Sequence, residues 1–343
     1  MTMVTPRGEL SRALTFLRFV AQQVKSRERI ALEIEEVESS PFTVDAPTIG
    51  LNAGESDWKP TGVFVTAGAN FAVSARGAIW LSRPLSIVLE PRASLWVRIS
   101  GTQRIAKLVD NDQIFSAWAS GEVEVFLKGG TEWSSRSGEI PSQHRASASG
   151  QIRVRVESTE RPATNISNPP NWSYLWRLGD GTIYSRGAGG RINIQTHGDV
   201  GILQTEVDHP ISPGTQVEWS WLVNRLPSQL AEDLSLTHDY LAVAVEFDDG
   251  RDLTYMWSAG LPNNYVFSCP LSFWCDRETH WVIRTRGDKL GVWYDERRNL
   301  WDDTLELYGS PPVKVVRLWL IANSVFQRSV GSASVQDLRI TDR

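Results

Sequence analysis

Residues 241–258, LAVAVEFDDGRDLTYMWS, contain the pattern that decides the fold. In the first half every second residue, from Leu241 to Phe247, is apolar, and this is the period of a β-strand. The dipeptide Asp249-Gly250 follows, and glycine readily adopts the positive φ that tight hairpins require. A second run, rich in apolar and aromatic residues, comes after the dipeptide. The stretch therefore predicts a β-hairpin with one uniformly apolar face.

Short runs of the same kind recur along the chain, among them TGVFVTAG, NFAVSA, GAIWLS, LWVRIS, EVEVFLKGG and GQIRVRVE. Short strands separated by turn residues are typical of sandwiches and barrels. No Rossmann glycine fingerprint and no phosphate-binding loop occurs, which argues against nucleotide chemistry. The sequence predicts a mainly β protein with two antiparallel, jelly-roll-like β-sandwich domains and one N-terminal amphipathic helix.

The length of 343 residues suits two domains. The segment ERPATNISNPPNW (160–172) is rich in Pro, Asn, Ser and Thr, a composition typical of a linker. We expect an N-terminal helix and strand over 1–45 packed on the body of the protein. A first sandwich over 46–158, a linker over 159–171 and a second sandwich over 172–343 should follow. Ten of the fifteen tryptophans lie after residue 160, which favours the second sandwich as the ligand-binding one.

The N-terminal helix is predicted from apolar residues at helical spacing, namely Leu10, Ala13, Leu14, Leu17, Ala21 and Val24. We expect this face to pack on the body of the protein. A helix on a membrane surface is the alternative, disfavoured because the basic residues are few. The next stretch, RIALEIEEVE (29–38), alternates Ile30, Leu32 and Ile34 with polar residues and predicts a half-exposed strand.

The composition, 41% hydrophobic and 22% charged, is that of a folded soluble protein. A net charge of −5 argues against a nucleic-acid partner, because phosphate neutralisation needs clustered Lys and Arg. No apolar run reaches the roughly 20 residues that span a bilayer, and the N-terminus lacks a signal-peptide core. We therefore expect a cytoplasmic protein without a membrane partner, in which Cys269 and Cys275 stay reduced. Homo-oligomer formation stays open.

Two strands of the second sandwich are predicted to present a mixed face beside an apolar one. In LAVAVEFD this face carries small alanines together with Glu246 and Asp248. In VVRLWLIAN it carries Arg317, Trp319 and Asn323. We expect these side chains to line the principal cavity of the domain, with Glu246 or Asp248 accepting a proton and Arg317 holding developing negative charge. A solvent-exposed face with a weak ion pair is the alternative.

Further aromatic and titratable residues are candidates for the site. Trp219, Trp221 and Trp257 are predicted to stack a sugar or flat ligand, or else to belong to the core. His238 and Tyr255 are candidates for moving protons, and a loop position is the alternative for His238. No zinc-protease helix and no two-histidine-one-carboxylate set occurs, so we expect neither a metal nor another cofactor.

Residues 58–157 resemble the β-sandwich of bacterial galactose-binding lectins. The likeness lies in WKPTGVFVTAGANFAVSARGAIWL and in GEIPSQHRASASGQIRVRVE. In those lectins loop carboxylates and amides hold sugar through calcium. The turn VDNDQIF offers Asp110, Asn111 and Asp112 as oxygen donors, while a solvated turn explains them equally. The resemblance implies the fold and leaves the sugar site open.

Residues 172–343 resemble an uncharacterised bacterial domain-of-unknown-function family with a concanavalin-like, jelly-roll sandwich. The likeness rests on VEWSWLV, AVAVEFDDGRDLTYMWS, KLGVWYDERRNLWDD and SASVQDLRI. Related sandwiches include glycan lyases, glycoside-processing enzymes and pure binding modules, so the fold alone does not decide the function.

Two classes of function fit these observations. The first is a metal-independent acid–base enzyme, of the lyase, hydratase, cyclase or hydrolase type, that acts on a sugar-like or polycyclic small molecule in the aromatic-lined groove. The alternative is a non-catalytic cytosolic protein that binds a carbohydrate or another small molecule. The expected cytosolic location argues against a lectin for extracellular glycans, and the lack of a sharp catalytic motif argues against the enzyme. Of the two classes we favour the enzyme, of a non-redox type.

Overall fold

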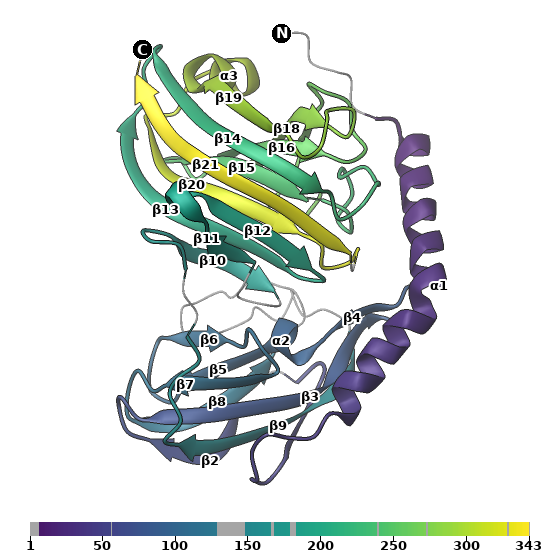
Figure 1. Cartoon of the computed structure of the whole chain (residues 1–343), viewed down its shortest axis with the longest axis vertical. Coiled ribbons are helices and arrows are strands. Elements are labelled where there is room, and N and C mark those ends of the chain that lie inside the picture. Colours follow the sequence, from purple (N-terminus) through teal and green to yellow (C-terminus); the bar gives the residue numbers. More distant parts are fainter. Residues whose placement is uncertain are drawn as a thin grey trace. The chain divides into compact units, whose positions relative to one another are not determined.

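The computed structural model describes residues 7–55, 57–128, 148–165, 168–178, 183–238, 240–271, 274–327 and 329–342 (Figure 1). The chain divides into two compact units. The N-terminal sandwich comprises Val20–Ile166 and Leu178–Gly181, and the C-terminal sandwich comprises Met1–Phe19, Ser167–Arg177 and Thr182–Arg343. Each has two sheets over the described residues, with an apolar core between them. The predicted mainly β, antiparallel sandwich class is confirmed.

The N-terminal sandwich is built from short strands joined by turns. Its elements are β1 (Ile49–Asn52), β2 (Lys59–Val65), β3 (Asn70–Ser82), β4 (Ile87–Leu89), α2 (Pro91–Ser94), β5 (Leu95–Ile99), β6 (Ile105–Lys107), β7 (Asp112–Ser116), β8 (Gly121–Leu127) and β9 (Ser149–Thr159). One sheet has the order β1-β9-β3-β4, with β7 also paired to β3, and the other has the order β2-β8-β5-β6. Alternate residues such as Val73, Val97 and Val125 are fully buried between the sheets, as the two-residue period requires.

The VDND turn of this unit has partners within the protein. The Arg76 guanidinium donates to Asp112 Oδ2 at 2.8 Å, and the backbone N–H of Arg92 donates to Asn111 Oδ1 at 2.9 Å. Arg76 is buried, so its charge needs the Asp112 carboxylate. Part of the stretch GEIPSQHRASASG, quoted above for the lectin likeness, lies outside the described residues.

The C-terminal sandwich has a larger pair of sheets. Its elements are β10 (Ser173–Leu178), β11 (Tyr184–Arg186), β12 (Ile192–His197), β13 (Val200–Pro210), β14 (Thr215–Arg225), β15 (Leu241–Phe247), β16 (Asp252–Ser258), β17 (Val266–Ser268), β18 (Glu278–Thr285), β19 (Trp293–Asn299), α3 (Leu300–Tyr308), β20 (Lys314–Asn323) and β21 (Val330–Asp342). The described strands form a seven-stranded sheet, β10-β13-β20-β15-β16-β18-β17, and a five-stranded sheet, β11-β12-β21-β14-β19. β16 and β18 pair parallel, and the neighbours from β13 to β16, the pair β17–β18 and all neighbours of the five-stranded sheet pair antiparallel.

The hairpin predicted from residues 241–258 is confirmed. β15 pairs antiparallel with β16, from Ala242 opposite Met256 to Glu246 opposite Asp252. Gly250 has φ 82°, the left-handed conformation that glycine adopts without a side-chain clash. Asp249 accepts hydrogen bonds from the backbone and side chain of Arg251 and so belongs to the turn.

The N-terminal helix differs from its prediction in length and in orientation. α1 runs from Glu9 to Ser39, so the strand predicted over 29–38 is wrong. Ile30 and Ile34 are buried because they lie one helical turn apart, against Ala78 and Val88 of the N-terminal sandwich. The face predicted to pack inward points outward instead, and the buried side chains are those of Thr15, Phe19, Gln23, Ile30 and Ile34. Within the described residues no helix is long and apolar enough to cross a membrane.

Candidate functional site

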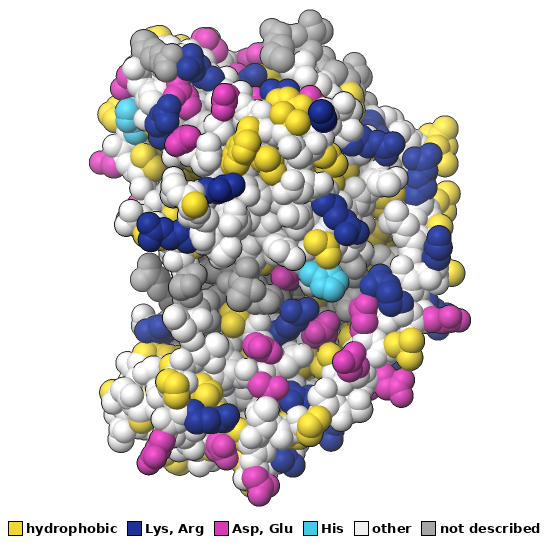
Figure 2. All heavy atoms as spheres, in the orientation of Figure 1, with side chains coloured by type: hydrophobic (Ala, Val, Ile, Leu, Met, Phe, Trp, Pro, Cys, Tyr) yellow, Lys and Arg dark blue, Asp and Glu magenta, His cyan; other side chains and the backbone are white. Residues whose placement is uncertain are grey.

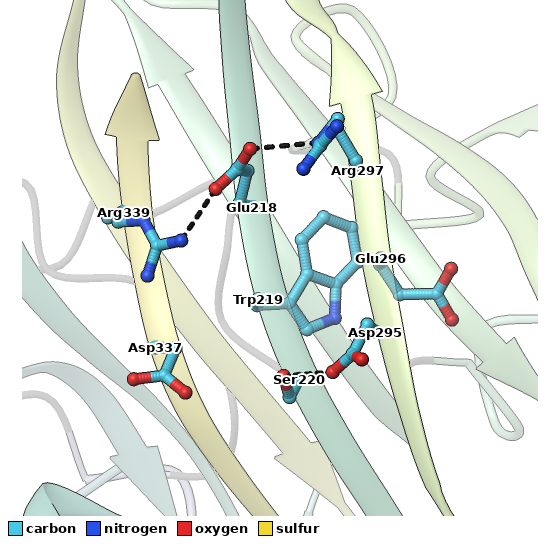
Figure 3. Close-up of a pocket in the computed structure, with 8 residues that line it drawn as sticks. All are labelled: Glu218, Trp219, Ser220, Asp295, Glu296, Arg297, Asp337 and Arg339. Atoms are coloured by element: carbon cyan, nitrogen blue, oxygen red, sulfur yellow. Dashed lines mark hydrogen bonds and ion pairs between the residues drawn. The ribbon is translucent and has the colours of Figure 1, made fainter.

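A depression of about 420 Å³ lies on the five-stranded sheet of the C-terminal sandwich (Figure 3). Its lining comes from β14, β19 and β21 and comprises Glu218, Trp219, Ser220, Asp295, Glu296, Arg297, Asp337 and Arg339. Because side chains alternate along β14, Trp219 and Trp221 face the core, while Glu218 and Ser220 face away from it. The depression is therefore built on the outer side of this sheet. We call it the strand pocket.

Glu218 is the central charge of the strand pocket. Arg297 of β19 lies 2.8 Å from Glu218 Oε1, and Arg339 of β21 lies 2.7 Å from Oε2 (Figure 3). The Glu218 side chain is only 6% exposed, whereas the two arginine side chains are 52% and 54% exposed. One largely buried carboxylate is thus compensated by two guanidinium groups that also reach solvent.

A β-bulge in β21 shapes the wall of the strand pocket that this strand forms. In β21, Arg339 pairs with Glu218 and Gln336 with Ser220, so two residues of β21 lie opposite the single residue between them on β14. Asp337 is one of the two and has φ 57°, a left-handed conformation that Asp tolerates better than most residues. The bulge turns the exposed Asp337 carboxylate to the strand pocket. Across the pocket, Ser220 Oγ donates to Asp295 at 2.5 Å.

The tryptophans predicted to stack a ligand lie inside the sandwich. Trp219, Trp221 and Trp257 are at most 2% exposed and pack against one another, with ring centroids 5.6 Å and 5.4 Å apart. Trp221 Nε1 donates to Glu296, and Trp257 Nε1 donates to the carbonyl of Thr285. Trp219 reaches the strand pocket from below, and none of the three offers an open stacking platform. All three tryptophans therefore belong to the core, which is the alternative predicted for them.

The predicted mixed face exists, but it is covered. Ala242 and Trp319 share the outer face of the seven-stranded sheet and are fully buried. Trp319 packs edge-on against Trp274, with ring centroids 6.2 Å apart, and residues such as Tyr265 complete a second apolar cluster. The open groove expected here is therefore absent from the described part of the chain.

The polar members of that face have structural partners. Glu246 pairs with Arg317 at 2.8 Å, and Asn323 Nδ2 donates to the carbonyl of His238 at 3.0 Å. Asp248 Oδ1 accepts from two backbone N–H groups at the start of β20, each at 3.1 Å, so it is part of the turn. The structure brings Glu246 and Arg317 together, as expected, but outside the strand pocket.

The two proposed proton carriers are also held in the fold. Tyr255, a core residue, donates to Asp303 at 2.6 Å, and Asp303 is paired with the partly buried Arg298 at 2.6 Å. Burial and the Asp303 charge raise the pKa of Tyr255 well above its ordinary value, so the phenol stays protonated at neutral pH. His238 Nδ1 lies 2.9 Å from the carbonyl oxygen of Ser235, in the segment before β15.

Carboxyl groups with raised pKa values lie elsewhere in the C-terminal sandwich. Burial raises the pKa of Glu232 to about 8. Hydrogen bonds from Ser258 and from the backbone of Ala259 lower this pKa, but their effect is smaller than that of burial. Burial, followed by the charge of Glu278 on the adjacent strand, raises the pKa of Asp252 well above its ordinary value. Glu232 belongs to no recognisable sequence motif, so its burial could not be predicted from the sequence.

The sequence-based prediction of a site does not include the residues of the strand pocket, because it rests on the tryptophan face of VEWSWLV. The opposite face of that run carries Glu218 and Ser220, and the same sorting of YDERRN places Asp295 with Arg297. Strand alternation could have found these four; the bulge at Asp337 has no comparable sequence signal. Within the described ranges, no group of three or more His, Cys, Asp or Glu side chains is placed to hold a metal ion. Cys269 and Cys275 are not joined by a disulfide.

Comparisons with known proteins give one family match and several distant structural likenesses. Residues 180–339 match the model of a family described as a protein of unknown function, DUF3047. No curated protein matches the chain. The N-terminal domain of EclA, a PllA-like lectin, is 17% identical and covers 33% of this chain and 95% of its own, with a TM-score of 0.26.

Two further structures are similar to this chain at still lower identity. The xyloglucanase domain of NopAA, a type three effector from Sinorhizobium fredii, is 11% identical and covers 52% of this chain and 96% of its own, with a TM-score of 0.31. A structure of carbohydrate-binding modules from the β-sandwich superfamily is 9% identical and covers 87% and 99%, with a TM-score of 0.24. Each structural likeness is distant, so the chemistry of this chain is argued from its own residues. The family match covers residues 180–339.

Proposed function

We propose that this protein binds a neutral, hydroxyl-rich ligand of the saccharide class at the strand pocket and does not convert it. The observation that carries the proposal is the Glu218 carboxylate shared between Arg297 and Arg339, with Asp295 and Asp337 beside it. Carboxylates accept hydrogen bonds and guanidinium groups donate them in pairs. Neighbouring hydroxyls of a sugar can do both, so they match a surface where donors and acceptors alternate.

The charge of the lining favours a neutral ligand over an anion. Four lining residues are acidic, namely Glu218, Asp295, Glu296 and Asp337, and two are basic, Arg297 and Arg339. A phosphate or carboxylate ligand would meet this acidic excess at short range, where like charges repel. The volume of about 420 Å³ lies within the range of small-molecule sites and has room for one or two sugar rings.

The placement of the titratable groups supports binding rather than acid catalysis. A general acid must hold a proton near neutral pH, which requires a raised pKa. The carboxyls with raised pKa values, Glu232, Asp252 and Asp303, are buried and do not line the strand pocket. Glu218 lines the pocket, and its two oxygens are already engaged in ion pairs with Arg297 and Arg339. The acid–base enzyme activity predicted from the sequence stays a prediction, which a turnover assay would test.

The test is a calorimetric titration of the full chain with neutral mono- and disaccharides, accompanied by mass spectrometry of the sugar recovered afterwards. Asp295→Asn and Asp337→Asn keep size and remove one charged acceptor each, so each should weaken binding by about tenfold. Asp208→Asn is the matched control, since Asp208 is an exposed carboxylate paired with Lys314 outside the pocket.

Three results would contradict this assignment. If no neutral saccharide binds, the ligand class is wrong. If the control variant weakens binding as much as the two pocket variants do, the site is wrong. If the recovered sugar is cleaved, dehydrated or isomerised, the protein is an enzyme.

A further inference from the structure

The first half of α1 presents an apolar stripe to solvent. Leu10 is 76% exposed, Leu14 49%, Leu17 59% and Val24 61%. Their spacing of three, four and seven residues places them on one side of the helix, roughly opposite the buried Phe19. Large apolar side chains gathered on one surface are unusual without a partner that covers them.

Basic residues accompany this stripe. Between Leu10 and Arg27 the helix contains four basic residues, Arg12, Arg18, Lys25 and Arg27, and no Asp or Glu. At 100° per residue, Arg18 and Lys25 lie along one edge of the stripe and Arg27 along the other, and all three are exposed. Figure 2 shows both apolar and basic side chains along the outer edge of α1.

The second half of the same helix has the opposite character. From Glu28 to Ser39 it carries five glutamates and one arginine, and Glu28 stands where the stripe would continue. Leu32 continues the apolar side beyond Glu28 but stands among these glutamates. Apolar and basic residues are therefore combined only in residues 10–27, which we call the basic segment. At 1.5 Å per residue it is about 27 Å long.

We propose that the basic segment of α1 docks on an anionic membrane surface, lying parallel to it with Leu10, Leu14 and Leu17 at the boundary of headgroups and acyl chains. The positive charge of the basic segment favours an anionic membrane as its partner. In a second copy packed in parallel, Arg18 and Lys25 would meet their own like charges, whereas acidic headgroups neutralise them. An antiparallel second copy avoids that repulsion, and the dimer measurement below distinguishes it from a membrane. Apolar burial and electrostatic attraction then act together, as in other interfacial helices. Because the stripe is opposite the buried face of α1, docking requires no unpacking of the helix.

The test uses the full chain and sedimentation with vesicles of phosphatidylcholine alone or with one third phosphatidylglycerol. We expect partitioning to the mixed vesicles only, weakening as salt is raised because exposed charges are screened. Leu14→Glu with Leu17→Glu should abolish it, and Arg18→Glu with Lys25→Glu should weaken it by about tenfold or more. Val313→Glu is the control, since Val313 is an apolar residue that is 74% exposed and lies outside α1.

Three outcomes would overturn the proposal. Equal partitioning to both kinds of vesicle, or to neither, would contradict the predicted lipid chemistry. Equal loss in the Val313→Glu control would show that the stripe has no special role. A dimer in analytical ultracentrifugation that Leu14→Glu converts to monomer would assign the stripe to a second copy. Circular dichroism of each variant checks that α1 still forms, and saccharide binding is measured separately because it does not depend on this helix.

Discussion

Glu232→Gln tests the placement of a fully buried carboxyl in the C-terminal sandwich. The wild-type group has a pKa of about 8 in the folded protein and an ordinary value of 4.5. Between these values the folded protein keeps a proton that the unfolded chain has released, so the free energy of unfolding falls as pH rises. The difference between 4.5 and about 8 corresponds to roughly 5 kcal/mol across the whole window.

The variant cannot titrate, while its amide keeps the size of the acid and can still accept from Ser258 or Ala259. Urea denaturation at about pH 5, 7 and 8.5 should show the wild-type protein losing roughly 3–5 kcal/mol more than the variant over this range. Asp208→Asn is the control and should keep the wild-type slope, because the hydrogen bond and charge of Lys314 lower the pKa of Asp208 below this window. Parallel pH profiles for wild type and Glu232→Gln would refute the reasoning.

Two further changes test the cores of the two sandwiches. Asp303→Asn removes the charge that compensates Arg298, whose side chain is only 16% exposed. We expect the free energy of unfolding, measured by urea denaturation, to fall by about 3 kcal/mol. A loss below about 1 kcal/mol would contradict the buried pairing. Gly77→Ala should destabilise the N-terminal sandwich by more than about 1 kcal/mol, because Gly77 has φ 117° and a new Cβ would lie 2.3 Å from a carbonyl oxygen of β9. An unchanged melting temperature for Gly77→Ala would show that β3 and β9 are not paired in this way.

The parts of the fold that depend on neighbouring residues were predictable from the sequence. The Asp249-Gly250 turn and the alternation from Leu241 to Phe247 are local patterns, and both are found as predicted. The orientation of α1 was not predictable, because both of its faces carry apolar side chains. Periodicity identifies the set around Leu14 and the set around Phe19, but it does not say which set meets the rest of the protein.

The candidate site depends on contacts between distant parts of the chain. Glu218, Arg297 and Arg339 come from three strands that are far apart in the sequence, so their ion pairs depend on strand pairing that no local pattern specifies. The same reason explains the mixed face around Trp319. Its alternation was predicted, whereas Trp274, which covers it, comes from another part of the chain.

The parallel pairing of β16 and β18 also decides which sheet of the C-terminal sandwich can carry a site. Two parallel strands cannot be joined by a tight turn, so the chain must travel back along the sheet between them. The described residues 259–271 and 274–277 belong to that return, and Leu261 and Tyr265 join the cluster that buries the outer face of the seven-stranded sheet. The return path therefore adds a third layer on one side of a two-layer sandwich. The five-stranded sheet has no such crossover among its described strands, and its outer side carries the strand pocket proposed to bind a ligand.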